Sequence, residues 1–144
     1  MCVTQQDQII SQQNTSYKQP LSMLEPRNWQ GGKMPRIYVA HPYGRRIALE
    51  PSELEANAQK AVMIGRQLMM KGWNPMIPNL YHYVHKGWVK SPDEVRWFHM
   101  VSEWIQFCDA FFYGGQSDGC DREWAIAQSY GLTIYENIED VPDA

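Results

Sequence analysis

The sequence predicts an α/β fold: a doubly wound, mostly parallel sheet of four to five strands between two layers of helices, a flavodoxin- or Rossmann-like three-layer sandwich. Two observations predict it. Short runs of β-branched and aromatic residues alternate with longer segments of helical periodicity, and turn-forming residues separate these segments throughout residues 34–144. Strands that alternate with helices form right-handed βαβ units and therefore a parallel sheet.

The first strand is expected at residues 36–40, RIYVA, before the turn-forming HPYGRR. A long helix is expected over 51–72, because Ser52 and Glu55 have capping-box spacing and Lys71 with Gly72 is typical of a helix end. Six residues of this helix share one small or apolar face, which should pack on the sheet: Leu54, Ala58, Ala61, Ile64, Gly65 and Leu68.

The remaining elements follow from the same signals. Ser91 and Pro92 with Glu94 are typical of a helix start, and Gly131 of a helix stop. The expected elements are a short buried strand at 73–78, a long aromatic loop at 79–90, a helix at 92–107, a strand at 110–113, a helix at 119–130 and a last strand at 132–135.

The composition fits one globular domain, with 144 residues, a mass of 16.8 kDa and 44% hydrophobic residues. A formal net charge of −3 disfavours a polymeric nucleic acid as partner, because such binding relies on a basic surface. No apolar run reaches the roughly 20 residues of a membrane helix, and the first residues lack the basic and apolar parts of an export signal. No membrane association is expected.

The cysteines and the N-terminal composition add two expectations. Cys2, Cys108 and Cys120 have neither zinc-site spacing nor the even number of a disulfide framework, which favours a reducing, cytoplasmic location. Residues 1–33 are rich in glutamine and show no sustained period, so we expect a flexible polar arm there and the folded domain at 34–144.

A ligand cleft is expected where the strand order reverses, outside the carboxyl ends of the strands. If the first strand is central, residues 41–46 and 114–123 border that cleft. Glu123 then lies in the first turn of a helix, where unpaired N–H groups and the helix dipole favour an ionised carboxylate. Such a group can act as a general base or as a nucleophile at an anomeric carbon. An acid in a first helical turn is also common helix chemistry without catalysis.

The segment before Glu123 has the groups that bind anions. Ser117 and Gly119 are expected at the start of this helix, where a hydroxyl and free N–H groups suit a phosphate or a sugar hydroxyl.

Several motifs in a fixed order resemble the nucleoside 2-deoxyribosyltransferase family, including its small relatives. They are RIYVAHPYG, Asn57 with two alanines on the first helix, GWNPMIPN, Trp97, and CDAFFYGGQSDGCDREWAIAQSYGLTIY. The most specific part is an aspartate before a strand, followed by Ser-x-Gly-x-x-x-Glu and small residues. The resemblance covers Met34 to about Tyr135.

The resemblance implies roles for three residues. Glu123 would attack the anomeric carbon of a 2-deoxyribonucleoside or its monophosphate, releasing the base and forming a ribosyl-enzyme intermediate. Asp109 would approach the nucleobase and help to protonate it as it leaves. Tyr38 would orient the nucleophile through its hydroxyl. Water would then resolve the intermediate; if a second base were held in a dry pocket, the same chemistry would become base exchange.

The resemblance also bears on the substrate. Ser117 stands where transferases have aspartate and the similar deoxynucleoside monophosphate N-glycosidases have a phosphate-binding serine; with Arg45 and Arg46 nearby, this favours a nucleotide. Asp118 leaves open a register shifted by one. The first loop and Gly115 differ from the family pattern, which puts the substrate's shape in question. The expected substrate-binding residues are His41, Pro42, Tyr43, Gly44, Arg45, Asn79, His82, Gly115, Ser117, Asp118 and Gly119.

Other chemistries have weaker support. The histidines, including His41, His82 and His85, lack a metal-binding motif, so neither metal nor cofactor is expected. Tyr81, His82 and Tyr83 either stack on a nucleobase or cover the sheet edge. Cys120 near a helix start is a third, weaker candidate for catalysis.

Two further expectations concern assembly and an alternative function. The segment 97–105 is more apolar than one buried face requires, which indicates a homo-oligomer, a dimer or larger, against the alternative of a merely aromatic core. The rival to an enzyme is a sensor that binds a nucleotide in the same cleft without cleaving it.

Overall fold

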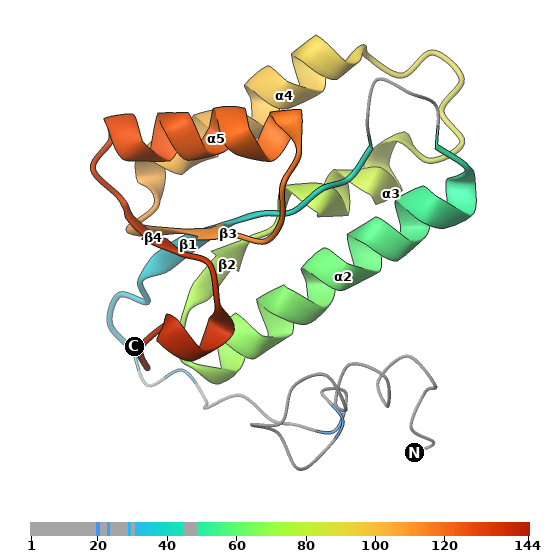
Figure 1. The fold of residues 1–144 in the computed structure, drawn as a ribbon. Helices are drawn as coiled ribbons and strands as arrows, with labels where there is room; N and C mark the ends of the chain where they lie inside the picture. The colour runs from blue at the N-terminus through green and yellow to red at the C-terminus, as the bar shows by residue number, and fades with distance from the viewer. Residues whose placement is uncertain (1–19, 21–22, 24–28, 30, 45–48) are drawn as a thin grey trace.

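The computed structural model describes residues 20, 23, 29, 31–44 and 49–144, and a parallel sheet lies at its centre. In the described residues the sheet has four strands, β1 (Arg36–Ala40), β2 (Asn74–Met76), β3 (Ala110–Tyr113) and β4 (Thr133–Tyr135), in the order β2-β1-β3-β4 and all parallel. Helix α2 (Pro51–Met70) covers one face, and α4 (Glu94–Ser102) and α5 (Asp118–Ser129) cover the other (Figure 1). The predicted α/β class and parallel sheet are confirmed. The arm expected at residues 1–33 lies largely outside the described residues.

The strand order reverses between β1 and β3. The chain passes from β1 outward to β2, then returns past β1 to β3 on its other side. Strands β1 and β3 end level with each other, since Ala40 is the register partner of Tyr113. The loops that leave these two strands therefore begin side by side, which is the crevice expected from a central first strand.

Alternate residues of β1 supply the cores on the two faces. Ile37 and Val39 pack with Leu68 of α2, whereas Tyr38 and Ala40 pack with Phe111 and the α5 side. These four side chains of β1 are at most 1% exposed. The hydroxyl-bearing ring of Tyr38 is thus placed under α5, the helix that carries Glu123.

Close approach at the crevice requires glycine. The N–H of Gly114 donates to the carbonyl of Ala40 over 2.7 Å, and a Cβ at Gly114 would lie 2.7 Å from the same oxygen. A side chain there would push the two strand ends apart.

Helix α2 begins at Pro51, the first residue of its expected range, but other residues than the expected ones cap it. Helix α2 has Glu50 as N-cap and Pro51 in its first turn, and Glu53 accepts from the N–H of Glu50 over 2.9 Å. The expected capping pair, Ser52 and Glu55, is therefore wrong: proline suits the first helical position and moves the start ahead of Ser52. Glu55 is left available for another contact.

Between residues 78 and 107 the chain contains more helical turns than expected, and the single helix expected there is split into two elements. The expected loop at 79–90 contains a 3₁₀ turn, η2 (Pro78–Tyr81), and the short helix α3 (His82–His85). The expected helix at 92–107 begins after Asp93, whose side chain accepts from the N–H of Arg96 over 2.9 Å, and tightens into η3 (Glu103–Phe107).

The chain ends in a further 3₁₀ turn, η4 (Ile138–Asp140), beyond β4. Helix α5 has Ser117 as N-cap and is followed by Gly131 at φ +71°. Strand β2 lies at one edge of the sheet, with Pro75 as its middle residue.

Within the described ranges, no helix has the length and apolar character that crossing a membrane requires.

Candidate active site

A cavity of about 1070 Å³ lies beyond the carboxyl ends of β1 and β3. It lies where α2 and α3 face α4 and the start of α5 (Figure 1). Nine of the residues expected from the sequence line it: His41, Tyr43, Gly44, Asn79, His82, Ser117, Asp118, Gly119 and Glu123. We refer to this cavity below as the main cleft.

Two other expected residues contribute differently. Pro42 and Gly115 pack against each other, since a Cβ at Gly115 would lie 3.1 Å from two ring carbons of Pro42. They join the two loops and do not line the main cleft. Arg45 lies outside the described residues.

Glu123 lies in the second turn of α5, because the helix begins at Asp118. Its Oε2 atom is buried and has no hydrogen-bond partner, although the side chain reaches the main cleft. Burial raises the pKa of Glu123 to about 7; the Tyr38 hydroxyl and the Arg122 charge oppose that rise. The expectation of a fully ionised carboxylate is corrected, since the free N–H groups of the first turn are too far along the helix to offset burial.

Tyr38 lies beneath Glu123 in the core. Its side chain is 0% exposed, and its hydroxyl, like Glu123 Oε2, has no hydrogen-bond partner among the described residues. Burial, and after it the Glu123 carboxyl, raises the pKa of Tyr38 well above its ordinary value. The two groups are thus neighbours that influence each other without a well-formed hydrogen bond. Of the two, only Glu123 borders the main cleft, and its buried Oε2 without a partner needs an explanation, which a bound ligand supplies.

Asp109 is not at this site. It directly precedes β3, so it lies at the amino edge of the sheet, opposite the main cleft. Its carboxylate accepts from the N–H of Arg36 over 2.8 Å and lies 4.0 Å from Lys33 Nζ. The expectation that Asp109 approaches a nucleobase is therefore wrong, because the full length of β3 separates this residue from the cavity at the carboxyl end of the strand.

The start of α5 forms one rim of the main cleft. The Ser117 hydroxyl accepts from the N–H of Cys120 over 3.1 Å, while the N–H groups of Asp118 and Gly119 belong to the first turn, where helices have no internal acceptors. The guanidinium of Arg122 lies 4.0 Å from the centre of the Phe98 ring, and both residues line the cavity. This rim combines a fixed cation with oriented donors, as an anionic group would require.

His41 lies at the centre of the crevice with a defined tautomer. Its Nδ1 is 2.8 Å from the carbonyl oxygen of Pro42, which also accepts from Asn79 over 3.4 Å. A carbonyl can only accept, so Nδ1 carries the proton and Nε2 has the lone pair when the ring is neutral. Burial lowers the pKa of His41, which favours that neutral form.

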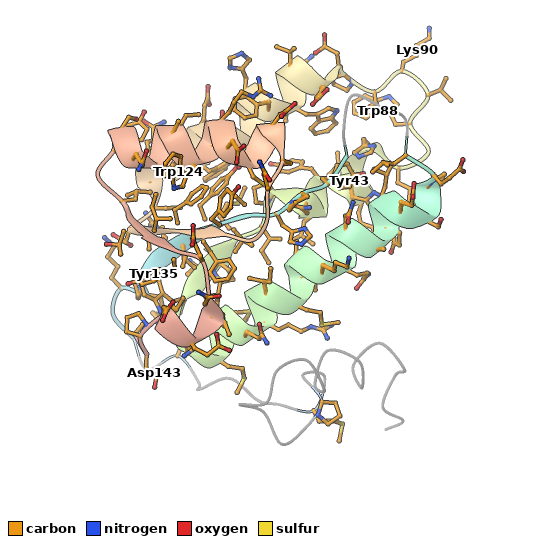
Figure 2. All side chains as sticks on the ribbon, in the orientation of Figure 1. Tyr43, Trp88, Lys90, Trp124, Tyr135 and Asp143 are labelled. Atoms are coloured by element: carbon orange, nitrogen blue, oxygen red, sulfur yellow. The ribbon has the colours of Figure 1, made fainter. Side chains whose placement is uncertain are left out.

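The wall opposite α5 contains a polar cluster that the sequence did not indicate. The Tyr43 hydroxyl lies 2.5 Å from His82 Nδ1 and 2.6 Å from His85 Nε2, and His82 Nε2 lies 2.6 Å from a Glu55 oxygen. Figure 2 shows Tyr43 beyond the end of β1, between α2 and α3. We call Glu55, His82, Tyr43 and His85 the histidine cluster. The only sequence signal for it was the pair of histidines three residues apart on α3.

Aromatic rings line the cavity beside this cluster. The Trp97 ring lies 5.7 Å from those of both Tyr81 and His85. Tyr83 instead turns outward, where its hydroxyl contacts Glu55 and Gln59. Of the three aromatics considered for stacking, Tyr81 and His82 line the main cleft and Tyr83 covers the surface.

Thiol and metal chemistry find no support in the described part of the chain. Cys120 is buried, and burial raises the pKa of its thiol to about 12. No three His, Cys, Asp or Glu side chains of the described residues are grouped as metal ligands.

Comparison of the chain with protein-family models gives no match, and comparison with curated proteins gives none either.

Proposed function

We propose that the protein cleaves the N-glycosidic bond of a nucleoside 5′-monophosphate or nucleoside, with Glu123 as nucleophile and water as the favoured acceptor. The observation that carries this proposal is the Glu123 carboxyl itself. It has a buried, unpaired oxygen, it borders a cavity of about 1070 Å³, and the unpaired hydroxyl of Tyr38 lies beside it. A cavity of this size accommodates a nucleotide.

The cavity has a different chemistry at each end, which matches the parts of a nucleotide. The α5 rim, with Ser117 and Arg122, suits the phosphate, and the rings of Tyr81 and Trp97 suit the flat base. Glu123 lies at the rim end, where the sugar would be. His41 Nε2 is an acceptor for a sugar hydroxyl.

The reaction proceeds in two steps. The ionised Glu123 carboxylate attacks C1′, the C1′–N bond breaks, and its electron pair leaves with the base. Water then attacks C1′ and frees the carboxylate. Because the pKa of Glu123 is about 7, only about half of the enzyme carries the nucleophile at neutral pH, and the rate should rise with pH through that value.

A nucleotide sensor is the second candidate, and the same pKa favours it. A carboxyl group that keeps its proton near pH 7 can donate a hydrogen bond to a ligand without attacking it. Base exchange is the third outcome, if the bound intermediate excludes water.

One experiment separates the three. Purified protein is incubated with deoxynucleosides and their monophosphates, and free base is followed by chromatography, with and without an added acceptor base. Hydrolysis gives base alone, exchange gives a new nucleoside only with the acceptor, and a sensor gives neither. Glu123→Gln keeps the size of the side chain and removes the nucleophile, so base release at the wild-type rate in this variant would refute the proposal.

An oligomer is also proposed. Val95, Trp104 and Phe107 of the α4–η3 segment are 62%, 48% and 57% exposed, an apolar excess that a dimer would bury. Analytical ultracentrifugation measures the oligomeric state, and a protein that stays monomeric at high concentration would contradict the proposed oligomer.

A further inference from the structure

The histidine cluster joins three elements across one wall of the main cleft. Glu55 comes from α2, Tyr43 from the loop after β1, and His82 and His85 from α3. The three contacts are all between 2.5 and 2.6 Å. His82, in the middle, is 4% exposed, while His85 is partly exposed and lines the cavity. The cluster thus runs from the Glu55 carboxylate to an imidazole that faces the ligand space.

Proton positions in the cluster follow one from another. The Tyr83 hydroxyl, and after it His82, holds the pKa of Glu55 down to about 2, so this carboxylate can only accept. His82 Nε2 must then donate to it. In a neutral His82 ring, Nδ1 accepts from the Tyr43 hydroxyl, and the Tyr43 oxygen accepts from His85 Nε2. The remaining nitrogen of His85, Nδ1, then has a lone pair.

One added proton reverses two of these bonds. If His85 Nδ1 gains a proton, His85 Nε2 passes its own to the Tyr43 oxygen, and Tyr43 passes its hydroxyl proton to His82 Nδ1. His82 then carries both protons beside the Glu55 carboxylate, which it approaches to 2.6 Å. Lys86 Nζ, at 3.6 Å from the same carboxylate, and Tyr83 are the other polar partners of Glu55 that lie near this charge.

We propose that the histidine cluster is a proton relay, which holds one proton on His82 and delivers it through His85 to the nucleobase as the glycosidic bond breaks. This inference rests on the proposed function and assigns the acid that it needs. His85 is the catalytic residue. Tyr43, His82 and Glu55 are positioning residues that act through it.

The protons balance over both steps. In the first, Glu123 bonds to C1′, the base nitrogen keeps the bonding pair and takes the proton of His85 Nδ1. Tyr43 then returns a proton to His85 Nε2, and His82 Nδ1 returns one to Tyr43. In the second, water oxygen bonds to C1′, Glu123 leaves as a carboxylate, and the water proton enters at His85 Nδ1 and restores the relay.

Two further observations support this assignment. Asp109 lies at the opposite edge of the sheet, so the acid expected from the resemblance is absent from the main cleft. The Trp97 ring lies 5.7 Å from that of His85, so a base stacked on Trp97 would be beside the relay's outer end. Burial, and after it the charge of His82, lowers the pKa of His85, while a hydrogen bond with its own backbone opposes that change.

The test compares two leaving groups in the same enzyme. A guanine deoxynucleotide needs a proton on the departing base, whereas its N7-methylated form carries a cationic base that departs neutral. Tyr43→Phe keeps the ring and interrupts the relay. We expect the rate of base release in a single turnover, which precedes the attack of water, to fall about 100-fold on the unmethylated substrate, within the usual range for acid catalysis, and by less than about 3-fold on the methylated one. Tyr113→Phe is the matched control, because it removes a 2.7 Å hydroxyl contact to Asp121 outside the main cleft.

Equal loss on both substrates, or no loss on the unmethylated one, would overturn the relay. If Tyr43→Phe fails to fold, His85→Asn and the wild type decide: His85→Asn should show the same selective loss, and single-turnover base release by the wild type should be slower in D₂O only for the unmethylated substrate. An equal isotope effect on both overturns the relay as well. Failure of the proposed function differs, since wild type would then release neither base and Glu123→Gln would change nothing.

Discussion

Glu123 should make the protein less stable as pH rises from 4.5 to 7. Burial raises its pKa from the ordinary value of 4.5 to about 7 in the folded protein. Between these values the folded state holds a proton that the unfolded state has lost, so unfolding becomes easier as the pH increases. The full contribution is present below pH 4.5 and is lost above pH 7. The difference between the two pKa values corresponds to roughly 3 kcal/mol as an upper bound.

The assay is urea denaturation at pH 5 and pH 8 for wild type and Glu123→Gln. The variant cannot ionise, so it should lose about 2.5 kcal/mol less than wild type over this range, since part of the titration lies below pH 5. In thermal unfolding, the same difference corresponds to roughly 10 °C. Glu139→Gln, at an exposed carboxylate in η4, is the control and should follow wild type. Parallel pH profiles for wild type and Glu123→Gln would refute the burial of a proton-binding carboxyl at this position.

Three other substitutions test separate parts of the structure. Asp109→Ala should leave base release within about 2-fold of wild type and cost about 1 kcal/mol in urea denaturation, because its carboxylate accepts from the N–H of Arg36; a large kinetic loss would contradict its place at the far edge. Ser117→Ala should cost about 1 kcal/mol as a lost helix cap and raise KM for monophosphates more than for nucleosides, and an equal rise would argue against a phosphate at this rim. Gly114→Ala should destabilise by more than about 2 kcal/mol, since its Cβ would lie 2.7 Å from the Ala40 oxygen, and a melting temperature equal to wild type would show that the strand ends can separate freely.

The parts of the fold that local signals determine could be predicted from the sequence. Strands β1 and β3 are runs of β-branched and aromatic residues with turn residues after them, and both have the expected bounds. The N-cap of α2 was harder to predict from the sequence, because Pro51 takes the first helical position and Glu50 caps the helix in place of the expected Ser52. The crevice followed from the alternation of strands and helices, which fixes where the carboxyl ends of neighbouring strands meet.

The site was predictable only where its residues follow a strand directly. His41 comes straight after β1, and Ser117 and Glu123 follow β3 closely, so the topology alone places them together. The position of Asp109 was predicted wrongly because the resemblance compares only the order of residues along the chain. A residue directly before a strand lies at the amino edge of a parallel sheet, opposite the cleft. The histidine cluster was missed because its partners are 27 to 42 residues apart and no local pattern connects them.

Pro75 limits how this sheet can grow. The N–H groups of Asn74 and Met76 face β1, since Asn74 donates to the carbonyl of Pro35 and neighbouring residues of a strand alternate in direction. The middle donor on the outer side of β2 would belong to residue 75, and proline has none. A strand from another chain that approached β2 would therefore find this edge without its central donor, so extension of the sheet by strand pairing is disfavoured on the β2 side.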